Sequence, residues 1–318
     1  MTIGAGRRRR RPARVARAIA PVWQAPRWML DAATTDALLR HIGLDARPAP
    51  DAEGLRAVHR AFLSSVSYDG LTAQLAEHAP LDPGALVERT LASGRGGYCF
   101  EINTVLFALL EALGFAIQRR EGVVGERTAF AAGEPTNHLA VVATTTEGTS
   151  FICDAGWGEG PLEPLPLDAG AHAGPGPLSW TVERDDAAAG AGWWVAQHAW
   201  GSTPGFRFGD APVPPAAFAP HHRRIATAPD SPFVQTLVVQ RPFDDHVVTL
   251  RARTLSRKGP GRDERSVLPD EDALAATLRD VFAINPEALG AERLARLWRQ
   301  ACAQHAAFVG SANAAGAG

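Results

Sequence analysis

The sequence contains few cysteines and no long apolar run, and both features restrict where the protein can work. Its three cysteines, at positions 99, 153 and 302, are odd in number and widely spaced, which does not fit a disulfide framework. Free thiols persist in the reducing cytoplasm. No apolar stretch is long enough to span a bilayer, and the segment 16–22 is too short for a secretory signal and is interrupted by Pro21. We therefore expect a cytoplasmic protein that does not contact membranes.

Lysine is almost absent, and the basic residues are unevenly distributed. Lys258 is the only lysine, and seven of the 32 basic residues are arginines within the first 17 positions, where no acid occurs. The remaining 25 basic residues stand against 34 acidic ones, so we expect no nucleic-acid surface on the body of the protein. The arginine-rich start is interpreted as a disordered extension or a start codon assigned too far upstream. Arginine in place of lysine, with abundant Ala, Gly and Pro, indicates a GC-rich bacterial genome.

Cys99 lies in the most informative segment, Arg-Gly-Gly-Tyr-Cys-Phe-Glu, which spans residues 95–101. The two glycines permit a tight turn, and an apolar pattern with helical spacing follows, through Ile102, Leu106 and Leu109. Cys99 shares the buried face of this predicted helix. A thiol in the first turn of a helix feels the positive end of the helix dipole, which lowers its pKa and favours the reactive thiolate.

Two β-prone segments supply the other residue types that thiol catalysis needs. His138 begins the apolar segment 138–144, and Asp154 ends the segment 150–154. The polar residues 144–149 between them predict a hairpin turn. In nucleophilic catalysis a histidine takes the thiol proton, and an aspartate fixes the imidazole tautomer and stabilises its charge. Each residue alone has an ordinary interpretation, as a packed cysteine, a core histidine or a turn aspartate, but together they predict a catalytic triad.

The hairpin carries a testable constraint on register. Side chains alternate between the two faces of a strand, so His138 and Asp154 share a face only if directly opposed residues have numbers with an even sum. A two-residue turn at Glu147-Gly148 would give an odd sum and separate them. We therefore predict a three-residue or bulged connection around residues 145–147.

These segments resemble those of the arylamine N-acetyltransferases, and the resemblance covers roughly residues 30–260. The motif at 95–101 is similar to the nucleophile motif of that family, Asn137-His138-Leu139 to its histidine strand, and Asp154-Ala155-Gly156-Trp157-Gly158 to its aspartate loop. The resemblance implies a ping-pong transfer of an acetyl group from acetyl-CoA, a co-substrate and not a bound cofactor, to an arylamine through an acyl-cysteine. It implies catalytic roles for Cys99, His138 and Asp154.

The resemblance also implies supporting and substrate-binding residues. Asp69 would pair with Arg95 and brace the nucleophile turn at Gly97. The substrate would contact three aromatic side chains, those of Tyr68, Phe100 and Trp157.

Departures from the family pattern leave the substrates open. Gly70 stands where an asparagine is usual, and His221-His222-Arg223-Arg224 replaces a stretch with an aromatic residue and a Ser-Thr pair. One alternative is an amide synthase of natural-product biosynthesis, which forms a macrolactam or takes its acyl group from an acyl carrier protein. A second alternative is a transglutaminase-like or protease-like thiol enzyme. The oligomeric state stays open.

The order of periodic patterns predicts an α+β fold with a thiol-protease-like Cys-His-Asp arrangement. We expect a basic extension over 1–27, a helical domain with the nucleophile over 28–114, and a central antiparallel β-barrel or sheet with His138 and Asp154 over 115–215. An α/β lid over 216–310 and a flexible tail over 311–318 follow. Residues 169–177 are predicted to be a loop, and residues 286–307 a helix.

Several other features are interpreted as structural. Adjacent histidines at 221 and 222 cannot easily share one ion, and no other ligand cluster is evident, so we expect no metal. Neither a P-loop nor a dinucleotide fingerprint is present. Alternation turns Cys153 away from the face of Asp154, and we interpret Cys153 as a packing residue and Cys302 as a residue of helix packing.

Overall fold

The computed structural model describes residues 29–128, 135–174, 176–185 and 190–316. The predicted N-terminal extension, residues 1–27, lies outside this part of the chain. Within it, no helix combines the length and the apolar character needed to cross a lipid bilayer.

Helices dominate the N-terminal part, as the sequence predicts. Asp31, Asp51 and Asp82 each cap a helix by accepting a hydrogen bond from the backbone N–H three residues later, which satisfies one of the free donors of the first turn. The helices are α1 (Ala32–His41), α2 (Ala52–Ser65), α3 (Leu71–Gln74), α4 (Pro83–Ser93) and α5 (Cys99–Ala112).

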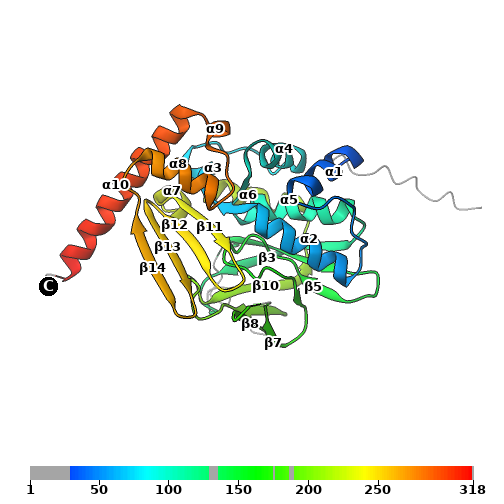
Figure 1. Ribbon diagram of the computed structural model, residues 1–318. Coiled ribbons are helices and arrows are strands. Elements are labelled where there is room, and N and C mark those ends of the chain that lie inside the picture. The colour runs from blue at the N-terminus through cyan, green and yellow to red at the C-terminus, as the bar shows by residue number, and fades with distance from the viewer. Residues whose placement is uncertain (1–28, 129–134, 175, 186–189, 317–318) are drawn as a thin grey trace, which may run out of the picture.

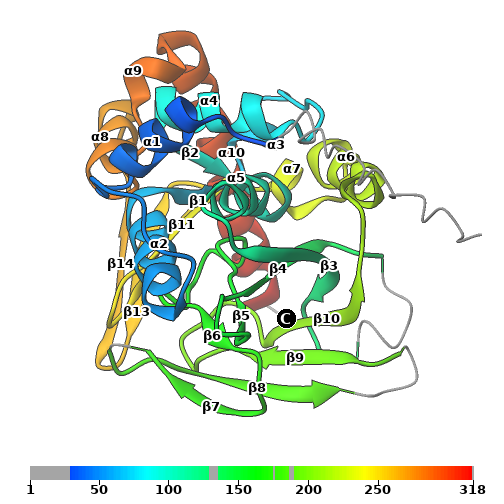
Figure 2. The same cartoon turned by 90° about the vertical axis from the view of Figure 1, so that its right-hand side faces the viewer.

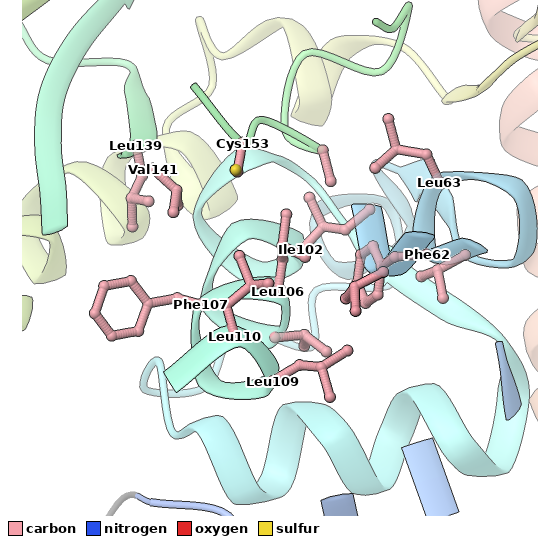
Figure 3. Close-up of a cluster of buried hydrophobic side chains, with 14 of the residues drawn as sticks. Phe62, Leu63, Ile102, Leu106, Phe107, Leu109, Leu110, Leu139, Val141 and Cys153 are labelled. Carbon is pink, nitrogen blue, oxygen red and sulfur yellow. The ribbon is translucent and has the colours of Figure 1, made fainter. Parts of the chain in front are cut away.

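Helix α5 is the centre of the main hydrophobic core. All of its residues from Cys99 to Leu110 are buried, so the predicted buried face is confirmed, although the burial extends around the whole helix. Figure 3 shows Ile102 and Leu106 packed between Phe62 and Leu63 of α2 and the side chains of the sheet beyond. A helix that is apolar on every side is stable only when it is enclosed in this way.

The central part is an antiparallel sheet that curls into a barrel (Figure 2). Its strand order is β6-β5-β4-β3-β10-β9-β8-β7 among the described strands. The strands are β3 (Ala116–Val124), β4 (His138–Thr144), β5 (Ser150–Ile152), β6 (Leu165–Pro166), β7 (Gly170–Ala173), β8 (Ser179–Asp185), β9 (Gly192–Ala196) and β10 (Gly205–Pro212). The predicted α+β fold with a central barrel-like sheet is confirmed.

The hairpin between β4 and β5 has the predicted parity. Thr144 is opposite Ser150 and Val142 is opposite Ile152, so opposed numbers have an even sum. The connection is the three residues 146–148, closed by a bond from the Thr145 N–H to the Thr149 carbonyl, with Gly148 at a φ of +85°. A glycine in this left-handed conformation is typical of three-residue hairpin loops.

A second sheet combines strands from the N-terminal and the C-terminal parts of the chain. Its order is β14-β13-β12-β11-β1-β2, and the short strands β1 (Ser67–Asp69) and β2 (Arg95–Gly97) come from the N-terminal segment that was expected to be helical. The C-terminal strands are β11 (Val238–Pro242), β12 (Val247–Arg251), β13 (Thr254–Gly259) and β14 (Arg262–Val267). The predicted domain boundaries stay a prediction, but strands from the predicted helical domain, 28–114, and from the predicted lid, 216–310, pair in this sheet.

Helices of four to 26 residues complete the C-terminal part. They are a 3-10 turn, η1 (Pro215–Phe218), and the helices α6 (Ala219–Thr227), α7 (Pro232–Gln235), α8 (Glu271–Asp280), α9 (Pro286–Leu289) and α10 (Ala291–Gly316). Figure 1 shows α10 running beside the C-terminal sheet.

Two local predictions were wrong. The loop expected at 169–177 contains strand β7, because its backbone pairs with β8 although its sequence has little strand character. The single helix expected over 286–307 is broken at Gly290, and α10 then continues through residue 316, into the segment predicted as a flexible tail. The alanine-rich sequence there has a high helix propensity, which accounts for the longer helix.

Because α5 is enclosed on all sides, replacing one of its buried side chains by a smaller one should lower the free energy of unfolding strongly. Leu106 is fully buried in the main core, so Leu106→Ala should lower the free energy of unfolding by about 2–5 kcal/mol. The change is measured by urea denaturation. Val267→Ala, at a position 48% exposed, is the control and should change stability by less than about 0.5 kcal/mol. Equal effects of the two variants would contradict this account of the core.

Candidate active site

Cys99 occupies the first residue of α5, at the end of a turn that only glycine can form. Gly97 has a φ of +88°, and a Cβ atom there would lie 2.2 Å from a carboxylate oxygen of Glu101. The Gly97 N–H donates a 2.8 Å hydrogen bond to Asp69, whose other oxygen accepts from the Leu71 N–H at 3.0 Å. A buried carboxylate thus holds the backbone just before the cysteine, as expected of Asp69.

The ion pair expected between Arg95 and Asp69 is longer than the hydrogen bond from the Gly97 N–H to Asp69. Their closest atoms are 3.8 Å apart, whereas Arg95 donates to Glu77 at 3.0 Å. A second carboxylate, missed in the sequence, acts on the same turn through Arg89. Buried Glu101 accepts from Arg89 at 2.8 Å and from the Thr72 hydroxyl at 3.0 Å, and Arg89 also donates to the Gly96 carbonyl at 3.1 Å. Two carboxylates therefore brace the segment that carries Cys99.

His138 and Asp154 meet in the interior, as the hairpin register requires. The His138 Nε2 lies 2.6 Å from the Asp154 Oδ2, and both residues are almost completely buried. Burial by itself lowers the pKa of His138, but the Asp154 carboxylate and the nearby Cys99 sulfur outweigh it and raise the pKa to about 10. The geometry therefore favours the imidazolium form at neutral pH.

Cys99 lies beside this pair. Its Sγ donates to the Asn137 carbonyl at 3.3 Å, and its sulfur is close enough to raise the pKa of His138. The other ring nitrogen of His138, Nδ1, is buried and makes no hydrogen bond of good geometry within the described part of the chain. The three predicted catalytic side chains are thus brought together at the end of α5.

Asn103 organises the site but escaped the sequence analysis. Its Nδ2 donates to the Asp154 Oδ1 at 2.8 Å and to the Leu139 carbonyl at 2.6 Å, while its Oδ1 accepts from the backbone N–H groups of Ala155 and Gly156. The available signal was an amide four residues after Cys99 on an otherwise apolar helix. One turn of helix therefore positions both the nucleophile and the aspartate loop.

The aspartate loop fits closely against the nucleophile at Gly156. A Cβ atom on Gly156 would lie 2.8 Å from the Cys99 Cα and 2.6 Å from the Asn103 amide nitrogen. These distances are shorter than non-bonded carbon contacts allow, so this position requires glycine.

Cys99 opens into a cavity of about 390 Å³ between the barrel and the C-terminal part. Cys99, His138, Tyr68, Trp157 and Phe233 line it, together with charged side chains from α6 and β12. Tyr68 and Trp157, which were expected to contact substrate, thus line this cavity.

Phe100 does not line the cavity, so its expected position was wrong. It is fully buried and makes ring contacts with Tyr98, Phe218 and His222. The residue after Cys99 points about 100° around the helix from it, into the core.

Comparison with known proteins identifies the family. The model of the N-acetyltransferase family matches residues 51–289. The arylamine N-acetyltransferase of Mycolicibacterium smegmatis is 32% identical over 71% of this chain and 82% of its own length. The chain belongs to the arylamine N-acetyltransferase family.

Solved structures of the arylamine N-acetyltransferases share the fold. The enzyme from Mycobacterium abscessus superposes with a TM-score of 0.74, at 29% identity, over 84% of this chain and 94% of its own. The enzyme from Mycobacterium marinum, solved in complex with CoA, gives a TM-score of 0.73 at 24% identity over 84% and 98%.

The paired histidines play different parts in this N-acetyltransferase fold. His222 is buried; its Nδ1 lies 2.6 Å from the Tyr98 hydroxyl and its Nε2 lies 2.7 Å from the Ala79 carbonyl. His221 lines the cavity. Among the described residues no group of three His, Cys, Asp or Glu side chains could hold a metal ion. Cys153 packs in the main core beside Leu139 and Val141 (Figure 3).

The raised pKa of His138 predicts how stability depends on pH. A pKa of about 10 in the folded protein, against 6.5 for an ordinary histidine, means that protonation of this ring stabilises the fold. The contribution is complete below pH 6.5 and is lost as the pH rises through about 10. The free energy of unfolding, measured in urea across this range, should therefore fall as the pH rises.

A variant without the imidazole isolates this effect. His138→Gln should remove part of the pH dependence, whereas His172→Gln, on β7 and outside the cavity lining, should keep it. An unchanged slope in His138→Gln would show that folding does not favour the imidazolium.

Proposed function

We propose that this protein transfers an acetyl group from acetyl-CoA to an arylamine through an acetyl-Cys99 intermediate. The observation that carries the proposal is the His138–Asp154 contact of 2.6 Å beside Cys99, at the wall of one cavity. Family membership supports the same reaction. The free state of the described cysteines supports a cytoplasmic location, and the arginine-rich, lysine-poor composition supports a bacterial source.

The first half-reaction acetylates Cys99. The Cys99 thiol proton resides on His138 in a thiolate–imidazolium pair, and Asp154 stabilises this imidazolium and holds its orientation. The thiolate attacks the thioester carbonyl of acetyl-CoA, and the CoA thiolate leaves with the proton from His138. The Gly97 N–H is already bonded to Asp69, so the Cys99 N–H at the start of α5 is the better candidate to stabilise the oxyanion, an interaction worth about 3 kcal/mol.

The second half-reaction moves the acetyl group to the amine. Aromatic amines are weak bases, so at neutral pH they are uncharged and keep a lone pair available. The amine attacks the thioester carbonyl of acetyl-Cys99, His138 accepts its proton, and the Cys99 thiol is restored. Tyr68, Trp157 and Phe233 offer aromatic surfaces against which such an acceptor can stack.

The covalent intermediate predicts ping-pong kinetics. Initial rates measured against acetyl-CoA at several fixed concentrations of an arylamine should give parallel double-reciprocal lines. Mass spectrometry after exposure to acetyl-CoA should find one acetyl group on Cys99. Cys99→Ser should lose nearly all activity, whereas Cys302→Ser, on α10, is the matched control and should keep it. Converging lines, or an acetyl group elsewhere, would contradict the scheme.

The role proposed for Asp154 predicts a large loss without it. Asp154→Asn keeps the shape of the side chain but removes the charge that orients His138, so kcat should fall by about 10⁴-fold, as in hydrolases with a similar triad. Circular dichroism checks that the variant folds. A loss of less than about tenfold would show that the imidazole is positioned by other groups.

A further inference from the structure

We propose that His222 is a positioning residue for the acceptor, because it ties helix α6, one wall of the cavity beside Cys99, to the residue that precedes the nucleophile. This inference rests on the proposed function, since it concerns the amine of the second half-reaction. His222 belongs to the segment 221–224, where the sequence departs from the family pattern, so we derive its role from its contacts in this chain.

Helix α6 has two functional faces, and the adjacent histidines lie on different ones. His221, Arg224 and Ile225 line the cavity, at the i, i+3 and i+4 spacing of one helix face. His222 points about 100° away from His221 around the helix and is 2% exposed, on the side that packs in the interior. The buried histidine therefore lies behind the wall that an acceptor would meet.

The hydrogen bonds of His222 determine which of its nitrogens carries the proton. Its Nε2 lies 2.7 Å from the Ala79 carbonyl, which can only accept, so Nε2 is the donor. Nδ1 is then an acceptor, and the Tyr98 hydroxyl donates to it at 2.6 Å rather than to the His222 carbonyl at 3.4 Å. Burial lowers the pKa of His222, so the ring is neutral at pH 7 and forms both bonds together.

Tyr98 is the firmly held end of this connection. It is fully buried, and its carbonyl accepts from the backbone N–H groups of Glu101 and Ile102 in the first turn of α5. The N–H of the preceding Gly97 is bonded to Asp69. A tyrosine whose backbone is held from both sides is a fixed point to which a second element can be attached.

The other polar side-chain contacts of α6 hold the helix less firmly. Arg224 pairs with Asp230, six residues later, and both side chains are more than half exposed. His221 lies 4.0 Å from Glu121 of β3. Among the described residues no side chain caps the N-terminus of α6. The position of this cavity wall therefore depends on His222 more than the position of the nucleophile does.

The ring of Tyr98 supports the cavity wall at a second place. It stacks on Phe233 of α7, with ring centroids 5.4 Å apart and ring planes 28° apart, and Phe233 also lines the cavity. Tyr98→Phe keeps this stack and removes only the hydroxyl, so this variant isolates the hydrogen bond to His222.

Ping-pong kinetics separate the two half-reactions, because kcat/KM for each substrate depends on its own half-reaction alone. The donor in this test is S-acetyl-N-acetylcysteamine, a short thioester, and the acceptor is 4-methoxyaniline. In Tyr98→Phe and in His222→Phe, kcat/KM for the amine should fall about tenfold, because a buried polar group loses its partner and the wall shifts. The value of kcat/KM for the thioester should change by less than about twofold.

Further variants distinguish this hydrogen bond from a general loss of stability. Tyr98→Phe combined with His222→Phe should be no worse than His222→Phe alone, since both changes remove the same bond. His222→Asn, whose amide oxygen can replace Nδ1 as the acceptor, should recover part of the loss. Leu278→Ala, in the core of the C-terminal part, is the control, and it should lower stability without changing the ratio of the two kcat/KM values.

Two kinetic results would overturn the inference. Equal falls for the amine and the thioester would show that His222 serves the nucleophile and not the acceptor wall. An unchanged kcat/KM for the amine in His222→Phe would show that the wall does not depend on this histidine.

Hydrogen exchange keeps the test independent of the reaction. Backbone amides of residues 219–227 should exchange faster in His222→Phe than in the wild type, while those of residues 99–112 should keep their rates. If the wild-type protein takes acetyl from neither acetyl-CoA nor the short thioester, the proposed function fails, and the exchange rates still decide whether His222 holds α6. Unchanged exchange in α6 would reject the inference even in an active enzyme.

Discussion

Burial of the Asp154 carboxylate is the constraint on which the rest of the site depends. A charge taken out of water must be paired and hydrogen-bonded, or its burial costs several kcal/mol. Asp154 meets this demand through His138 on one oxygen and through Asn103 and the Gly156 N–H on the other. Each partner comes from a different element, so a single carboxylate fixes β4, α5 and its own loop relative to one another.

The same principle operates on the other side of Cys99. Asp69 and Glu101 are buried, and each binds the nucleophile turn or its flanking helices through backbone N–H, hydroxyl or guanidinium donors. The cysteine therefore stands between two sets of buried polar contacts. The carboxylates in both sets are hydrogen-bonded, which restricts their movement and suits a nucleophile that must stay aligned with its base.

Local patterns predicted much of this arrangement. The period of the apolar residues located α5, and the parity rule for the β4–β5 hairpin brought His138 and Asp154 to one face before any contact was known. Contacts between distant segments were not predictable in this way. The pairing of β1 with β11 joins residues about 170 positions apart. In the sequence Asn103 is a single polar residue in an apolar helix, and its role depends on partners at 139 and 154–156, which only the tertiary structure brings near. Phe100 was expected to contact substrate, but it follows Cys99 on α5, and consecutive residues of a helix point about 100° apart.

Strand β1 also fixes one wall of the cavity beside Cys99. Tyr68 and Asp69 pair with Gln240 and Val239, so Tyr68 and Gln240, which both line the cavity, lie on neighbouring strands of one ladder. Moving β11 away from β1 would break these backbone hydrogen bonds and disturb Asp69, which holds the nucleophile turn through the Gly97 N–H. This wall of the cavity therefore cannot shift without disturbing the turn that aligns Cys99.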